Sequence, residues 1–139
     1  RPVYRRGMGF SNVGLGLVHS MAHPLGAVYD TPHGVANAII LPTVMEYNAP
    51  ATGEKYRDIA KAMGVQGTDA MSLDDARKAA VDAVRQLGAD VGIPADLKEI
   101  VKDEDVDFLA QSAYDDACRP GNPRDTSVEE IKALYRSLM

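Results

Sequence analysis

The three histidines of this chain lie within fifteen consecutive positions. His19 and His23 are four residues apart, so on a helix their side chains project from the same face. His33 follows a turn signal at residues 30–32, which allows it to fold back beside the other two. Neutral imidazole is the commonest protein ligand of transition metals. The spacing alone leaves two interpretations open: a metal site, or hydrogen-bonded histidines in the core.

The segment around these histidines departs from two well-known motifs. The helical pair His19/His23 lacks the glutamate that follows the first histidine in metalloprotease helices, because position 20 is Ser20. The segment GMGFSN at residues 7–12 is not G-x-G-x-x-G, and no predicted strand precedes it. The sequence therefore argues against peptide hydrolysis and against a phosphate-binding loop.

The elements that must position the histidines are predicted to be helices, since no segment alternates as a strand does. The expected helices span residues 11–28, 32–48, 53–63, 72–91, 104–118 and 127–138. Thr31 is the expected N-cap of the second helix, with Pro32 as its first residue. Ser72 is expected to cap the fourth helix, and Ser127 with Glu130 forms a predicted capping box.

The clearest amphipathic pattern lies in residues 72–91. Its apolar residues recur at steps of three and four, as on one face of a helix: Leu73, Ala76, Ala80, Val84, Leu87 and Val91. Pro24 and Pro42 are expected to bend the first two helices.

Composition places the chain among ordinary globular proteins. Its 139 residues suit one domain, with 45% hydrophobic and 25% charged residues. The net charge of -5 argues against nucleic acid as a partner. Cys118 is the sole cysteine, so we expect no intrachain disulfide and a reducing, cytoplasmic location. The Arg-rich start and the polar run after it fit neither a signal peptide nor a membrane span.

Four segments together resemble the iron-containing (group III) alcohol dehydrogenases. They are GMGFSNVGLGLVHSMAHPLGAVYDTPHGVANAIILP, GEKYRDIAKAMGV, DVGIPADL and DDACRPGNPR. The resemblance covers residues 7–139, whereas residues 1–6 do not match. It implies an all-α fold, namely part of the helical metal-binding C-terminal domain of the dehydroquinate synthase-like fold. The NAD(P)-binding α/β domain of the family has no counterpart in this chain, so we expect a fragment of a longer protein.

The resemblance also implies roles for individual residues. His19 and His33 match two of the four Fe(II) ligands of the family; the other two, an Asp and a His on an earlier helix, have no counterpart here. This differs from the spacing alone, which favours His19 and His23 as the ligand pair. His23 matches a residue beside the nicotinamide and the substrate, where it can relay a proton. Phe10 and Cys118 match residues near the substrate, although a core phenylalanine and an inert buried thiol are equally compatible with them.

The activity implied by the resemblance is the reversible, NAD(P)-linked reduction of a short aldehyde to an alcohol. Zn(II) is a possible substitute for Fe(II), and a homo-oligomer is expected for the intact enzyme. With half of the metal ligands, the isolated chain is expected to be inactive. Two alternatives remain: a free-standing module that binds Zn(II) through all three histidines, and a purely structural helical domain.

Overall fold

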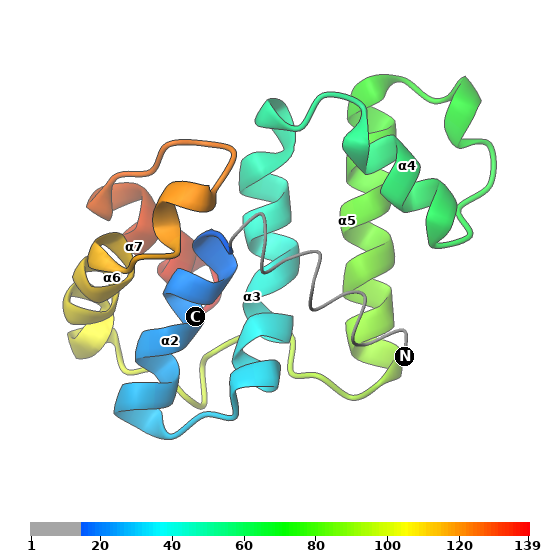
Figure 1. The fold of residues 1–139 in the computed structure, drawn as a ribbon. Helices are drawn as coiled ribbons and strands as arrows, with labels where there is room; N and C mark the ends of the chain where they lie inside the picture. Colours follow the sequence, from blue (N-terminus) through cyan, green and yellow to red (C-terminus); the bar gives the residue numbers. More distant parts are fainter. Residues whose placement is uncertain (1–14) are drawn as a thin grey trace, which may run out of the picture.

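A computed structural model describes residues 15–139, and within this range it contains helices and no β-strand (Figure 1). The α-helices are α2 (Leu17–Tyr29), α3 (His33–Asn48), α4 (Lys55–Ala62), α5 (Leu73–Asp90), α6 (Val106–Asp115) and α7 (Val128–Ser137). Four short 3₁₀ helices connect them, at Ala49–Ala51 (η1), Thr68–Ala70 (η2), Asp103–Asp105 (η3) and Arg119–Gly121 (η4). The predicted all-α class is confirmed for this range. The expectations for residues 1–6 and for Phe10 lie outside it.

Two of the predicted helix starts are confirmed by their capping hydrogen bonds. The Ser72 hydroxyl accepts a hydrogen bond from the backbone N–H of Asp75, 3.1 Å away. Ser127 and Glu130 form both bonds of a capping box at the start of α7. Each satisfies N–H groups that the first turn of a helix leaves unpaired.

The predicted N-cap of α3 is wrong by one residue. Asp30 adopts a left-handed conformation (φ 53°) and ends α2 by donating its N–H to Gly26. The N–H of Thr31 then donates to the carbonyl of Leu25, so Thr31 belongs to the end of α2. Pro32 takes the N-cap position, and His33 becomes the first residue of α3. The helix predicted to start at residue 11 is also shorter within the described range, since residues 15–16 are not helical.

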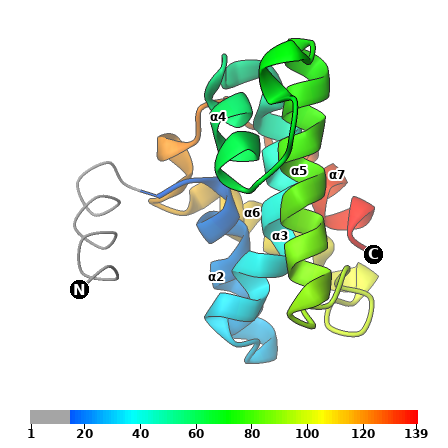
Figure 2. The same cartoon turned by 90° about the vertical axis from the view of Figure 1, so that its right-hand side faces the viewer.

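The core consists of two clusters on either side of α3. The larger one joins α3 to α2, α6 and α7, and includes Leu17, Met21, Leu25, Ile39, Ile40, Leu97, Leu109, Ile131 and Tyr135. The smaller one joins the C-terminal half of α3 to α4 and α5, and consists of Met45, Tyr56, Ala60, Ala80 and Val81. Figure 1 shows α3 between these two groups of helices, and in Figure 2, turned by 90°, α5 lies in front of α3.

The apolar stripe predicted for α5 is buried only in its first half. Ala76 and Ala80 are fully buried, but Leu87 and Val91 are 53% and 65% exposed. The smaller cluster ends at Val81 and its partly buried neighbour Val84. Farther along α5, Gly88 and Ala89 line a cavity with Ile39 and Pro42 of α3, whereas Leu87 and Val91 do not line it. None of the helices in residues 15–139 is both long and apolar enough to cross a membrane.

Candidate functional site

The turn between α2 and α3 brings the three histidines together. The ring centroids of His19 and His23, one helical turn apart on α2, are separated by 6.1 Å. His33, at the start of α3, lies 5.4 Å from His19 and 5.5 Å from His23, measured between ring centroids. The expectation that His33 folds back beside the other two is therefore confirmed.

The opposite face of α2 anchors the helix in the core. Leu17, Met21 and Leu25 recur every four residues and are fully buried. The Tyr135 hydroxyl of α7 donates a hydrogen bond to the carbonyl oxygen of Met21, 2.6 Å away. This buried contact fixes α2 midway between the turns that bear His19 and His23.

A carboxylate from the far end of the chain contacts His23. The Nδ1 atom of His23 lies 2.8 Å from Oδ2 of Asp116, which follows α6. Because an ionised carboxylate only accepts hydrogen bonds, Nδ1 is the donor, and Nε2 of the neutral ring is left as an acceptor. Burial alone would raise the pKa of Asp116, but hydrogen bonds from His23 and Cys118 outweigh it and hold that pKa below its usual value.

Cys118 lies beside the same carboxylate. Its backbone N–H donates to Oδ1 of Asp116 at 2.7 Å. Burial, followed by the hydrogen bond and negative charge of Asp116, raises the pKa of the Cys118 thiol. The thiol is therefore protonated and weakly nucleophilic at neutral pH. One ligand atom from each of His23, Asp116 and Cys118 lies within 4.8 Å of the others.

The pair His19/His33 has the chemistry of a cation site. Burial, and then the positive charge of His33 and His23, lowers the pKa of His19, which favours the neutral form that binds metals. Two imidazoles that share an ion at about 2.1 Å have ring centroids roughly 5 Å apart, close to the separation observed here. The Asn37 amide contacts Nε2 of His33 at 3.0 Å, while its own Oδ1 is buried with no hydrogen-bond partner in the described structure. The residues present therefore fit a divalent metal, with Asn37 free to reorient when His33 binds through Nε2.

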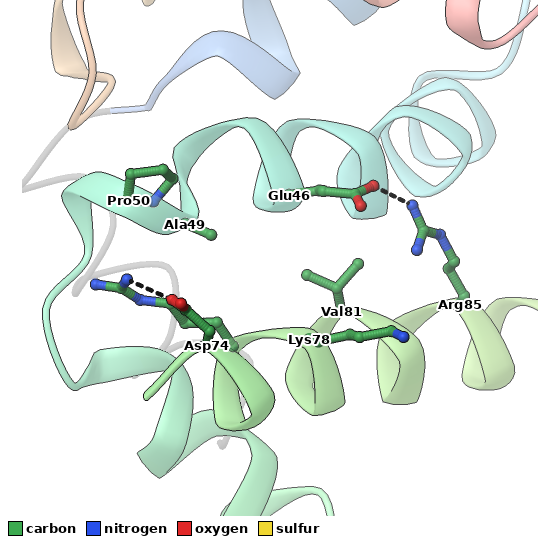
Figure 3. A pocket seen from close by; sticks show the side chains of 8 residues that line it. Glu46, Ala49, Pro50, Asp74, Lys78, Val81 and Arg85 are labelled. Atoms are coloured by element: carbon green, nitrogen blue, oxygen red, sulfur yellow. Dashed lines mark hydrogen bonds and ion pairs between the residues drawn. The ribbon is translucent and has the colours of Figure 1, made fainter. Parts of the chain in front are cut away.

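Two cavities differ in their relation to these residues. His19 and Asn37 line one of about 510 Å³ between α2 and α3, with mostly apolar surroundings such as Leu17 and Leu41. The other, about 270 Å³, lies between α3 and α5, where Arg85 pairs with Glu46 at 2.5 Å (Figure 3). None of the predicted site residues lines this second cavity. Only the first is a candidate for a substrate beside the histidines.

Four side chains lie beside His23, namely His19, His33, Asp116 and Cys118. The sequence indicated all of them except Asp116. Acidic residues on helices are usually exposed to solvent, so Asp116 does not stand out among them in the sequence. The available signal was the motif DDAC, in which Asp116 stands two residues before Cys118. Nothing in the spacing relates this motif to His23, which is 93 residues away in sequence.

Known proteins similar to this chain are alcohol-oxidising and aldehyde-reducing enzymes. The chain is 63% identical over 135 residues to lactaldehyde reductase of Escherichia coli, across 96% of this chain and 35% of that protein. It is 47% identical over 131 residues to 1,3-propanediol dehydrogenase of Citrobacter freundii, across 94% of this chain and 34% of that protein.

Two solved structures that are similar to this chain in sequence also have the same fold over the matched region. Alcohol dehydrogenase from Oenococcus oeni superposes with a TM-score of 0.91 at 42% identity, across 96% of this chain and 35% of that one. A 1,3-propanediol oxidoreductase gives a TM-score of 0.84 at 44% identity, across 90% and 33%. The chain thus spans about a third of the length of the relatives it matches. The model of the Fe-containing alcohol dehydrogenase family, C-terminal, matches residues 4–139, so the chain belongs to this family and represents its C-terminal helical region.

Proposed function

We propose that this chain is the metal-binding part of an NAD(P)-linked oxidoreductase that interconverts a short aldehyde and its alcohol. The observation on which this rests most is the cluster of three imidazoles, with one of them held by Asp116. The similarity to lactaldehyde reductase, at 63% identity, favours lactaldehyde and the corresponding diol as substrates. The hydride would come from NAD(P)H bound by a separate domain, because the sequence contains no dinucleotide-binding motif.

His19 and His33 would hold Fe(II), or Zn(II) in its place. A divalent ion there supplies a Lewis acid for the carbonyl oxygen of the aldehyde. The lowered pKa of His19 keeps its ring neutral and available as a ligand. Further ligands would come from outside this chain, so the chain alone would bind metal weakly and be inactive.

His23 would move the proton. After hydride has reached the carbonyl carbon, the alkoxide oxygen takes the proton from Nε2 of the protonated ring, giving the alcohol and a neutral imidazole. In the reverse direction Nε2 accepts the proton of the alcohol. Asp116 keeps Nδ1 protonated throughout, so that the exchange occurs only at Nε2. Cys118 and, from the family resemblance, Phe10 would contact the substrate.

The test separates metal binding from proton transfer. In the full-length protein, His19→Ala and His33→Ala should lose the bound metal after dialysis, measured by elemental analysis. His23→Ala should keep its metal and lose at least about 100-fold in kcat, a typical contribution of a general acid or base. Loss of metal from His23→Ala together with retention by His33→Ala would show instead that the helical pair His19/His23 is the ligand pair. Circular dichroism of each variant verifies that it is folded.

The substrate is tested separately, by consumption of NADH and NADPH with lactaldehyde and other short aldehydes. We expect turnover by the full-length protein and none by residues 1–139 alone. Tight Fe(II) binding by the 139-residue chain in calorimetry, lost in His33→Ala, would favour the free-standing three-histidine module over the oxidoreductase.

A further inference from the structure

Three different kinds of metal ligand meet beside α2, apart from the pair His19/His33. The imidazole of His23, the carboxylate of Asp116 and the thiol of Cys118 place one ligand atom each within 4.8 Å of the others. A tetrahedral ion with bonds of about 2.0–2.3 Å separates its ligand atoms by roughly 3.3–3.8 Å, so small side-chain rotations suffice. We propose that His23, Asp116 and Cys118 form a second cation site, which takes thiophilic divalent ions of the Zn(II) class.

Backbone geometry already orients two of these ligands. The hydrogen bond from the N–H of Cys118 to Oδ1 of Asp116, 2.7 Å long, fixes the turn that places both side chains on one side. The other oxygen, Oδ2, faces His23 at 2.8 Å. The Asp116 side chain is only 18% exposed, so a cation there would be partly shielded from water.

The ligand set determines which cations fit. Thiolate and imidazole favour Zn(II), Co(II) and Cd(II), whereas Mg(II) and Ca(II) require oxygen ligands. On binding, the Sγ–H bond of Cys118 breaks, its proton leaves to solvent, and the sulfur bonds to the metal. The proton on Nδ1 of His23 is lost from that atom, and the neutral ring carries its proton on Nε2. The thiolate and the carboxylate then balance the charge of a divalent ion.

Occupation of this site has a consequence for catalysis, which rests on the proposed role of His23. A ring that binds metal through Nδ1 retains its only proton on Nε2, and it cannot accept the proton of an alcohol there. It also loses its hydrogen bond to Asp116. Excess Zn(II) is therefore expected to inhibit the enzyme at a site other than the pair His19/His33.

Cobalt spectroscopy tests the site directly. Co(II) bound to a thiolate absorbs strongly in the near ultraviolet through sulfur-to-metal charge transfer, whereas Co(II) bound to nitrogen and oxygen alone lacks this band. We expect the band when Co(II) is added to the full-length protein. It should be lost in Cys118→Ser and in Cys118→Ala, and the dissociation constant should rise more than about 100-fold, beyond what loss of an outer-sphere group costs.

Further variants distinguish the two metal sites. His19→Ala should retain the thiolate band, and Asp115→Ala, a change at the exposed carboxylate next to the site, should leave it unchanged. Absence of the band in the unsubstituted protein, or its persistence in Cys118→Ser, would overturn the proposal. If His19 and His33 are not ligands, the thiolate band remains and only the weaker visible bands expected from Co(II) at those two histidines are missing. Each of the two proposals can therefore fail while the other holds. Zn(II) inhibition that is relieved at least 10-fold in Cys118→Ser supports the catalytic consequence; equal inhibition of both proteins contradicts it.

Discussion

Asn48 and Asn122 exchange two side-chain hydrogen bonds, in which each Nδ2 donates to the Oδ1 of the other at 2.8 Å. Asn48 is the last residue of α3, and Asn122 follows η4, 74 residues later. This pair joins the end of α3 to the loop that begins at Asp116. It therefore helps to hold Asp116 and Cys118 beside α2.

Removing one of these amides should cost more than half of the stability that is lost when both are removed. Asn48→Ala leaves the partly buried Oδ1 of Asn122 without its donor, although Nδ2 of Asn122 still donates to the carbonyl of Arg124. We therefore expect it to lower the free energy of unfolding by about 1–3 kcal/mol, measured in urea. Asn122→Ala should behave similarly, and the double variant should lose less than the sum. Gln111→Ala, at an exposed position of α6, is the control and should change little. Strict additivity of the two single losses would contradict the reciprocal bond.

Gly121 in η4 cannot become alanine without movement of the loop. A Cβ atom there would lie 1.9 Å from the carbonyl oxygen of Leu15, a backbone atom. We expect Gly121→Ala to destabilise the protein by about 1–3 kcal/mol, as overpacking does. Gly34→Ala is the matched control, since nothing lies within 4 Å of its added Cβ and the residue is in α3. That variant should be stabilised by up to about 1 kcal/mol.

Tyr135→Phe should change how stability depends on pH in the alkaline range. Burial strongly raises the pKa of Tyr135 in the folded protein. Below about pH 10 both states bind the phenolic proton; above it only the unfolded state loses the proton, so stability falls by up to about 1.4 kcal/mol per pH unit for this group. Unfolding in urea between pH 10 and 12 should show a shallower fall for Tyr135→Phe. Equal slopes for the two proteins would contradict the burial of this hydroxyl.

The same variant should also be less stable at neutral pH. It loses the hydrogen bond to the carbonyl of Met21, and we expect a cost of about 1–3 kcal/mol because that oxygen stays buried. Tyr114→Phe, at a half-buried position of α6, is the control for removal of a phenolic oxygen and should cost less.

Asp116→Ala should remove the preference of His23 for the tautomer that is protonated at Nδ1. Nitrogen chemical shifts of the ring should report Nδ1–H in the unsubstituted protein and a loss of that preference in the variant. Because the folded-state pKa of Asp116 is lowered, its stabilisation is present above the unfolded value near about 3.9 and is lost as pH falls through the folded value. The stability difference between the two proteins should therefore shrink in acid. Asp115→Ala is the neighbouring control, and a comparable change in the His23 ring there would contradict the assignment.

The fold could be predicted from local signals wherever those signals act within one turn. The caps at Ser72 and Ser127 are examples, since a side chain and an N–H three residues apart meet in any context. The N-cap of α3 could not be placed, because the preceding turn depends on Asp30 adopting a left-handed conformation. The exposure of Leu87 and Val91 was likewise not evident from the sequence. Periodicity identifies the apolar face of a helix but not how far along it a partner extends.

In the candidate site, too, local contacts could be predicted from the sequence and long-range contacts could not. The proximity of His19, His23 and His33 follows from a helix and a turn, both of which the sequence indicates. The contact of Asp116 with His23 depends on the packing of α6 against α2, and no local pattern encodes that. Roles of the individual histidines came from the family resemblance and remain predictions.

The two clusters on either side of α3 imply two levels of cooperative opening. The smaller cluster, with Tyr56 and Val81 among its members, supports α4 and α5 through few buried side chains, so this pair of helices should open at a lower free energy than the rest. Amide hydrogens of α5 would then exchange with solvent through a local fluctuation, while those of α2 exchange only through global unfolding. Helix α2 and the start of α3 belong to the larger cluster, so the histidines would stay assembled while the other half of the molecule fluctuates.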